Sequence, residues 1–259
     1  MVEKLNKRKC VSKTINIGDV YTACCGTKAV VIGYENRTKV LVEFQDEVRF
    51  RKYFTARNIR QGEFKNPYAP VVYGFAYYGE LDSKTVKDKS TYKRCYRAWQ
   101  NMLFRCYVKI ENNEPYLGCS VDPRWHNFTN FYYWFIEQKF NSKEYHLDKD
   151  LLVRGNKIYG ENFCCLLPRK INNLISGFSN IKVGDNVGSH FCKRDEYYIC
   201  NITMDGKVKC LGYFKTPEEA TDIYIKEKEA YVKKVAEDYK HLVTDEVYKS
   251  LIGWTVYPK

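Results

Sequence analysis

Between residues 145 and 174 the chain concentrates side chains that can move protons or hold a metal ion. His146 is followed two and four residues later by Asp148 and Asp150. Imidazole is the side chain whose ordinary pKa lies closest to neutral pH, and carboxylate oxygens are ligands that suit magnesium. A base beside a divalent cation is what hydrolysis of a phosphodiester needs, and this spacing predicts such a site.

The elements expected to hold these groups are a strand, a turn, a second strand and a helix that begins after Pro168. This order could set His146 and the aspartates around one point, with an amide oxygen from the helix supplied by Asn172 or Asn173. A second interpretation stays open, because Asn and Asp often do no more than cap turns and helices.

The charge of the whole chain points to a polyanionic partner. The chain has 259 residues, of which 44% are hydrophobic, and its formal net charge is +12. Nucleic acid is the commonest partner of such a balance, although an acidic protein would serve as well. Residues 1–70 hold 14 Lys and Arg against 7 Asp and Glu, so the N-terminal part contributes much of the excess.

The cysteines and the apolar runs predict the compartment of the protein and whether it contacts zinc or a membrane. Eleven cysteines, an odd number, in a long chain with no signal-peptide pattern predict a reduced protein in the cytoplasm. The adjacent pairs at 24–25 and 164–165 lack the spacer of common zinc sites, so no structural zinc is expected. No run approaches the roughly 20 apolar residues that span a bilayer, so no membrane partner is expected.

The pattern predicts an α+β protein in four segments. A basic arm over residues 1–14 precedes short β-rich runs over 15–70, which indicate a small antiparallel β-barrel of the SH3/Tudor-like kind. A larger domain over 71–185 and three strands with a helix over 186–259 follow. The exposed basic residues of the barrel could contact phosphates or be a solvated face; they are Arg37, Lys39, Arg49, Arg51, Lys52, Arg57 and Arg60.

Two helices are expected before the His146 segment. Residues 92–107 carry an apolar stripe at helical spacing, with Lys93, Arg94, Arg97 and Arg105 on the opposite face. That basic face could contact phosphates or simply meet water. An Asp-Pro start predicts a second, strongly aromatic helix over 124–140.

The strings YHLDKD, GNKIY and ENFCCLLPRKINNL, with YRAWQNMLFRCY and YLGCSVDPRWHNFTNFYYWF before them, resemble a phage-encoded branch of the HNH nucleases, which includes homing endonucleases. The resemblance implies a ββα-metal fold and a magnesium or manganese cofactor. It makes His146 the general base, and Asn162 the residue that ties the loop and fixes the imidazole. Asn172 becomes the distal metal-side residue, with Asn173 as the alternative.

One position departs from that family pattern. Many active HNH enzymes carry Asp or His as a metal ligand directly before the catalytic histidine, and here that position is Tyr145. Asp148 or Asp150 could replace it as metal ligands. If neither does, the metal site is weak or lost.

The C-terminal segment predicts three strands and a helix. A hairpin turn is expected at Asp205-Gly206, and Thr216-Pro217 begins the helix. The string around Gly212 to Ala220 resembles the ethylene-response-factor (APETALA-type) DNA-binding domain, which implies a sheet laid in the major groove. The implied contacts are Lys193, Arg194, Tyr197, Tyr198, Lys207 and Lys209. Alternatively, the sheet packs on the preceding domain.

Two functions are therefore expected. The first is a phage HNH-type endonuclease that binds double-stranded DNA and cleaves or nicks it with magnesium or manganese in the host cytoplasm. The second is a catalytically inactive HNH-derived phage protein that binds DNA, or that binds and inhibits a host protein. His146 with two nearby aspartates favours the first, and Tyr145 favours the second.

Overall fold

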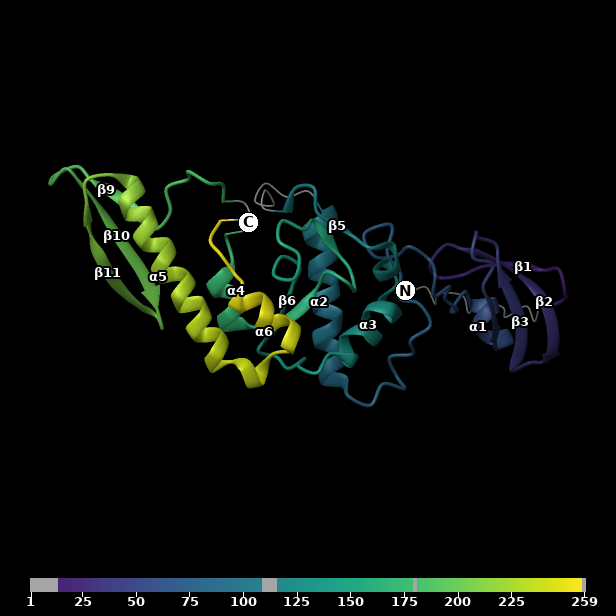
Figure 1. Ribbon diagram of the computed structural model, residues 1–259. Helices are drawn as coiled ribbons and strands as arrows, with labels where there is room; N and C mark the ends of the chain where they lie inside the picture. The colour runs from purple at the N-terminus through teal and green to yellow at the C-terminus, as the bar shows by residue number, and fades with distance from the viewer. Residues whose placement is uncertain (1–13, 109–115, 179–180, 258–259) are drawn as a thin grey trace, which may run out of the picture. The chain divides into compact units, whose positions relative to one another are not determined.

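The computed structural model describes residues 14–108, 116–178 and 181–257, so residues 1–13 of the predicted basic arm lie outside the described residues. The fold is mixed α+β with several small sheets, as expected. The chain divides into two compact units, residues 1–80 and residues 81–259, called here the N-terminal unit and the large unit (Figure 1).

The N-terminal unit is a four-stranded antiparallel sheet with one short helix. In sequence order its elements are β1 (Val20–Thr22), β2 (Lys28–Asn36), β3 (Lys39–Phe44), β4 (Arg51–Phe54) and α1 (Ala56–Gln61). The strands follow the order β1-β2-β3-β4. Buried residues of β2 and β3 pack against Ala56 and Ile59 of α1 and against Phe64, and these form the core.

The predicted barrel is wrong, because this sheet does not close. The strands at its two edges, β1 and β4, are three and four residues long and pair with one neighbour each. The stretch after β4, which lies within the β-rich runs expected over 15–70, is instead α1. The Thr55 hydroxyl accepts a hydrogen bond from the Asn58 N–H at its start, and Gly62 adopts a left-handed backbone at its end.

The large unit begins with an aromatic helical core. Its first elements are α2 (Lys89–Tyr107), β5 (Ser120–Val121), the 3₁₀ helix η2 (Pro123–His126) and α3 (Phe128–Glu137). Trp99 of α2 is fully buried, and its indole N–H donates to the Trp125 carbonyl at 2.6 Å. The helix expected over 124–140 is broken at Asn127, whose side chain caps α3 by accepting from the Thr129 N–H.

The His146 segment has the expected order of strand, turn, strand and helix. It contains β6 (Tyr145–Asp148), β7 (Ile158–Tyr159), β8 (Cys165–Pro168) and α4 (Arg169–Ile175). β6 pairs with β8 in antiparallel register, with His146 opposite Leu167, whereas β7 pairs with β5. A two-stranded ribbon followed directly by a helix is thus built from β6, β8 and α4.

The C-terminal part has the three strands and the helix that the sequence predicts. It contains β9 (Ser189–Cys192), β10 (Tyr197–Met204), β11 (Lys207–Phe214), α5 (Pro217–Asp238), the 3₁₀ helix η3 (Lys240–Leu242) and α6 (Asp245–Ile252). The sheet order is β11-β10-β9, and α5 lies along one face of it (Figure 1).

One hydrophobic core joins residues on both sides of the predicted boundary at 185/186. Leu167 and Ile171 share it with Val232 and Val235 of α5 and with Leu251 of α6. The ribbon–helix segment and the C-terminal part therefore belong to the same compact unit.

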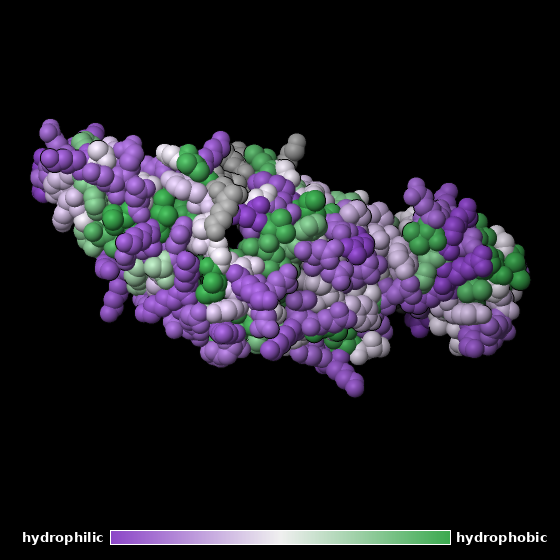
Figure 2. Space-filling view, in the orientation of Figure 1, coloured by the Kyte–Doolittle hydropathy of each residue, from purple (hydrophilic) through white to green (hydrophobic). Residues whose placement is uncertain are grey.

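The face in Figure 2 is largely hydrophilic, with apolar side chains in separate small patches. Across the described ranges, no helix is long and apolar enough to cross a membrane.

Candidate functional site

Helix α2 has two faces with different roles. Cys95, Trp99, Met102 and Leu103 are buried on one face. Arg94, Arg97, Asn101 and Arg105 recur every three or four residues, which places them along another stripe of the same helix.

These four polar residues line a cavity of about 290 Å³ together with His146 of β6 and Asn172 of α4. Lys143 and Ser142, from the loop before β6, also line it. Four cationic side chains therefore line the same cavity as the histidine, and among the described residues no carboxylate lines it. Such a donor-rich, cationic hollow suits an anion.

Arg94 is fixed in place at one side of this cavity. Its guanidinium donates to the Ser90 hydroxyl at 2.9 Å, to the Thr91 hydroxyl at 2.5 Å and to the Asn141 carbonyl at 3.3 Å. Its Nε is buried and has no hydrogen-bond partner among the described residues. Arg97 and Lys143, in contrast, are exposed.

Asn172 connects this cavity to a larger one. A second cavity of about 710 Å³ shares Asn172, Arg105 and Leu147 with the first. The first cavity, between the arginine face of α2 and β6, is called here the His146 groove; the second cavity follows the loop after β6 and, unlike the first, is lined by Asp148 and Asp150. The structure thus brings together His146 and Asn172, two of the predicted catalytic residues, in one cavity.

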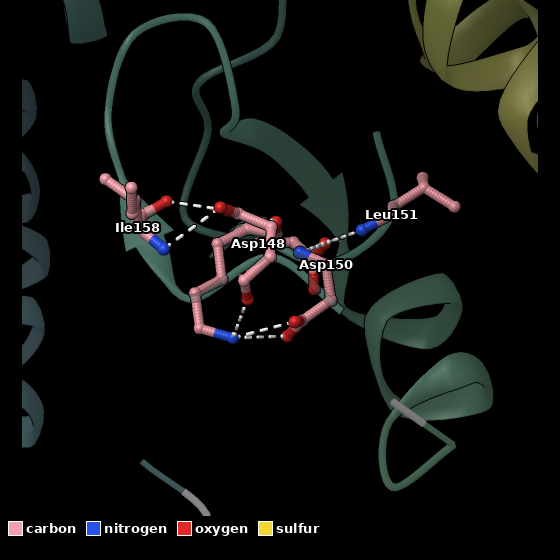
Figure 3. Close-up of polar contacts among 6 residues, drawn as sticks. Asp148, Asp150, Leu151 and Ile158 are labelled. Atoms are coloured by element: carbon pink, nitrogen blue, oxygen red, sulfur yellow. Dashed lines mark hydrogen bonds and ion pairs between the residues drawn. The ribbon is translucent and has the colours of Figure 1, made fainter. Parts of the chain in front are cut away.

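The two predicted carboxylate ligands hold the loop after β6 instead (Figure 3). Asp148 Oδ1 accepts hydrogen bonds from the backbone N–H groups of Asp150 and Leu151 at 3.0 and 2.8 Å. Both oxygens of Asp150 accept from Lys149 Nζ, at 2.7 and 2.8 Å. The same ammonium donates to the Asn156 carbonyl at 3.3 Å.

Burial changes the proton affinity of this loop. It raises the pKa of the Asp148 carboxyl, because the charged form is disfavoured away from water. Burial alone would lower the pKa of Lys149, but the hydrogen bond and charge of Asp150 outweigh it and raise that pKa. The buried lysine is therefore charged, with its three N–H donors used.

This donor set does not suit the magnesium or manganese ion expected from the sequence. A divalent ion of this kind takes several carboxylate, carbonyl or water oxygens. Asp150 already neutralises Lys149, and Asp148 already accepts two backbone N–H groups. Within residues 14–108, 116–178 and 181–257, no group of three or more His, Cys, Asp or Glu side chains is arranged to hold a metal.

Tyr145, at the position where the HNH pattern usually has a ligand, has a packing role. Its hydroxyl donates to the Leu242 carbonyl at 2.7 Å. Its ring stacks on Phe140 with the centroids 5.9 Å apart. Burial raises the pKa of this phenol, so it stays protonated and ties β6 to the C-terminal part of the large unit.

The other two asparagines lie elsewhere. Asn162 is exposed and lines a separate cavity of about 360 Å³ with Cys164 and Cys165. Asn173 faces a further hollow beside Tyr145 and Lys170. Neither lines the cavity of His146, so the structure gives no contact for the predicted role of Asn162 in fixing the imidazole.

The predicted contacts of the C-terminal sheet fall on two different faces. Lys207 and Lys209 lie opposite Met204 and Ile202, and Ile202 is buried against the helix side. Lys209 Nζ lies 3.8 Å from a carboxylate oxygen of Glu227 on α5. Both lysines, predicted as DNA contacts, therefore lie on the helix side of the sheet.

The remaining four predicted DNA contacts of this part lie on both faces of the sheet and in one turn. Tyr198 lies on the helix side with Phe191, their ring centroids 5.1 Å apart, whereas Tyr197 lies on the open face. Lys193 and Arg194 occupy the exposed turn between β9 and β10.

Basic residues of the N-terminal sheet are partly neutralised. Arg49 and Arg51 both pair with Glu43, at 3.4 and 2.7 Å, and Lys39 pairs with Glu35 at 3.5 Å. Three of the seven basic residues singled out in this part of the sequence thus have a carboxylate partner.

The sequence predicted the basic face of α2, but not that this face lies beside His146. More than 40 residues separate Arg97 and Arg105 from His146 in the chain, and only the packing of α2 beside β6 brings them to one cavity. Lys143 and Asn101 were missed altogether. The signal available was the spacing of Arg94, Arg97, Asn101 and Arg105 on one helical stripe.

Comparison with known protein families, curated proteins and solved structures gave no match to this chain.

Proposed function

We propose that this protein binds double-stranded DNA, with the groove between α2 and β6 holding the phosphate backbone. The observation that carries the proposal is the composition of the His146 cavity. Arg94, Arg97, Arg105 and Lys143 line it, and no carboxylate among the described residues does. Arginine and lysine contacts to phosphate supply nearly all of the non-specific affinity of proteins for DNA and a large share of the specific affinity.

The order of β6, β8 and α4 supports an HNH-type origin for this unit, as the sequence resemblance implies. The net charge of +12 supports a polyanionic partner. Double-stranded DNA is the partner that the resemblance favours.

The test replaces the two exposed cations of the cavity, Arg97 and Lys143, with alanine. For each phosphate that is no longer neutralised, affinity for a labelled duplex is expected to fall about fivefold near physiological salt, and the slope of log K against log salt to flatten by about 0.9. The matched control replaces Lys226 and Lys233, two exposed lysines of α5, and changes the net charge equally.

Equal losses in the cavity variant and the control would mean that charge alone, and not this groove, governs binding. No binding of duplex by the unmodified chain would remove the proposal.

A second candidate function is cleavage or nicking of the bound DNA, as an HNH-type endonuclease. It is favoured by one observation, that His146 and Asn172 line the same cavity. The engagement of Asp148 and Asp150 by the loop after β6 counts against it.

Supercoiled plasmid incubated with magnesium or manganese separates the two functions. Nicking that is lost in His146→Ala, while duplex affinity is kept, would support the enzyme. Duplex binding without nicking by either protein would leave a DNA-binding protein derived from the same fold.

A further inference from the structure

The sheet of the C-terminal part has one face that the described residues of the large unit leave uncovered. Cys200 on β10 donates its thiol hydrogen to the Ala220 carbonyl of α5 at 3.4 Å, and Ile202 is buried, so alternate residues of β10 face the helix. Tyr197, Ile199, Asn201 and Thr203 therefore point the other way.

Neighbouring strands extend this open face. Residues directly opposite in an antiparallel pair lie on the same side of the sheet. Register adds Val208, Cys210 and Tyr213 from β11, and His190 and Cys192 from β9. Of the described strand residues, no Lys, Arg, Asp or Glu lies on this face.

Two tyrosines dominate one end of it. Tyr197 and Tyr213 lie with their ring centroids 4.9 Å apart and their planes at 75°. Tyr213 is 63% exposed. Val208, 71% exposed, continues the uncharged surface towards the other end of the same strand.

Cations lie around the tyrosines, together with one carboxylate, Asp195, which accepts hydrogen bonds from the Tyr197 hydroxyl at 3.2 Å and from the Cys192 thiol at 3.3 Å. Lys193 and Arg194 are in the turn that leads into Tyr197, and Lys215 follows β11 directly. Because Tyr198 pairs with Phe214, this turn and Lys215 lie at the same end of the sheet as the two tyrosines. Arg194 pairs with Asp195, but its side chain is 86% exposed, and such surface pairs contribute little.

This arrangement suits unpaired bases better than a duplex. Base edges in the major groove are read chiefly by paired contacts from charged and amide side chains, and the open face offers one amide, Asn201, with Thr203 and His190 beside it. The flat faces of bases are hidden in a duplex but are available in a single strand, where exposed aromatic rings stack on them.

We propose that the open face of the C-terminal sheet binds single-stranded nucleic acid. Tyr213 and Tyr197 stack on bases, and the cations Lys193, Arg194 and Lys215 hold the backbone. This site is separate from the His146 groove, and the proposal does not depend on duplex binding there.

The test measures binding of the full chain to a fluorescently labelled oligothymidine in reducing buffer, by anisotropy. Tyr213→Ala is expected to weaken binding about tenfold, the usual order for loss of one stacked base. Tyr213→Phe should keep the affinity, whereas Tyr213→Leu should not, because it retains apolar area but no aromatic ring.

The contribution of charge is tested with a matched pair of double variants. Lys193→Ala with Arg194→Ala should flatten the salt slope by about 1.4, since each neutralised phosphate of a single strand contributes about 0.7. Lys207→Ala with Lys209→Ala removes the same charge from the helix side of the sheet and should leave the slope unchanged.

Three results would overturn the proposal. The first is no binding of oligothymidine, which would leave the face to a protein partner. The second is full affinity in Tyr213→Leu. The third is duplex binding that depends on Tyr213 as strongly as single-strand binding does. Loss of duplex affinity in the Arg97 and Lys143 variant, with oligothymidine binding kept, would show that the two sites are independent.

Discussion

Two lysines of the large unit are almost equally buried but have opposite surroundings. Lys149, in the loop after β6, is 5% exposed, and Lys228, on α5, is 7% exposed. The Lys149 ammonium is bound by both oxygens of Asp150 and by the Asn156 carbonyl. The Lys228 ammonium lies 4.9 Å from the centre of the Phe178 ring, and among the described residues it has no hydrogen-bond or ion-pair partner.

The difference shows what a partner does for a buried charge. Burial lowers the pKa of Lys228 to about 8, whereas Asp150 raises the pKa of Lys149 in spite of burial. Asp150 therefore has a structural task that accounts for its position without any metal. The same comparison predicts that removing Asp150, the partner of Lys149, destabilises the folded protein, and that replacing Lys228 stabilises it.

The largest expected effect is that of Asp150→Ala. It would leave the Lys149 ammonium buried without its carboxylate, which costs 3–5 kcal/mol for a fully buried pair, and about 3 kcal/mol here because the Asp150 side chain is 33% exposed. Denaturant unfolding of the two proteins at neutral pH measures the difference.

The double variant Asp150→Leu with Lys149→Met is its control. It should recover most of the lost free energy of unfolding, because no charge remains buried. Unchanged stability in Asp150→Ala, together with loss of magnesium-dependent nicking, would instead make Asp150 a metal ligand.

Lys228→Met is expected to stabilise the protein at neutral pH. A fall of the pKa from 10.5 to about 8 corresponds to about 3 kcal/mol of unfavourable free energy. Loss of the cation–π contact with Phe178 destabilises the variant by about 1 kcal/mol, so the expected net stabilisation is about 2 kcal/mol. Lys226→Met, an exposed position on the same helix, should change stability little.

The pH dependence gives an independent check. Between pH 8 and 10.5 the unfolded chain binds more protons at this lysine than the folded chain, so folding stability rises with pH across that window. The advantage of Lys228→Met over the unmodified protein should therefore shrink from pH 8 upward. An advantage that is constant with pH would show that the gain comes from packing and not from the charge.

The order of elements could be predicted because its signals are local. Pro168 directly precedes α4, the Asp205-Gly206 turn joins β10 to β11, and the Thr216 hydroxyl caps α5. Each of these residues acts on the backbone within a few positions of itself. The HNH-type and ethylene-response-factor-type origins rest on resemblance and stay predictions.

The partners and positions of the charged side chains could not be predicted in the same way. Spacing places His146, Asp148 and Asp150 on one side of an extended strand, but β6 ends at Asp148, and Asp150 lies in the loop beyond it. The partner of each charge depends on contacts distant in sequence, as between Lys170 and Asp205 at 2.6 Å or between His146 and the arginine face of α2. The same holds for Lys207 and Lys209, whose side of the sheet depends on where α5 packs.

The smallest expected effect concerns Asp148, the other predicted ligand. Its carboxyl is held by two backbone N–H donors, and an asparagine side-chain oxygen can accept the same two hydrogen bonds, so Asp148→Asn should change stability by no more than about 1 kcal/mol. The folded-state pKa of Asp148 is raised, so the folded chain retains this proton at pH values where the unfolded chain has released it.

Stability of the unmodified protein therefore falls as pH rises from the ordinary value of 3.8 through the raised pKa, and the asparagine variant lacks this loss. Thermal unfolding of both proteins from acid to neutral pH should show the variant gaining on the parent across that window and keeping its advantage above it. A lead for the parent at neutral pH that grows on addition of magnesium would instead assign Asp148 to a metal site, because an ion that binds only the folded state stabilises it, and does so more as the concentration of the ion rises.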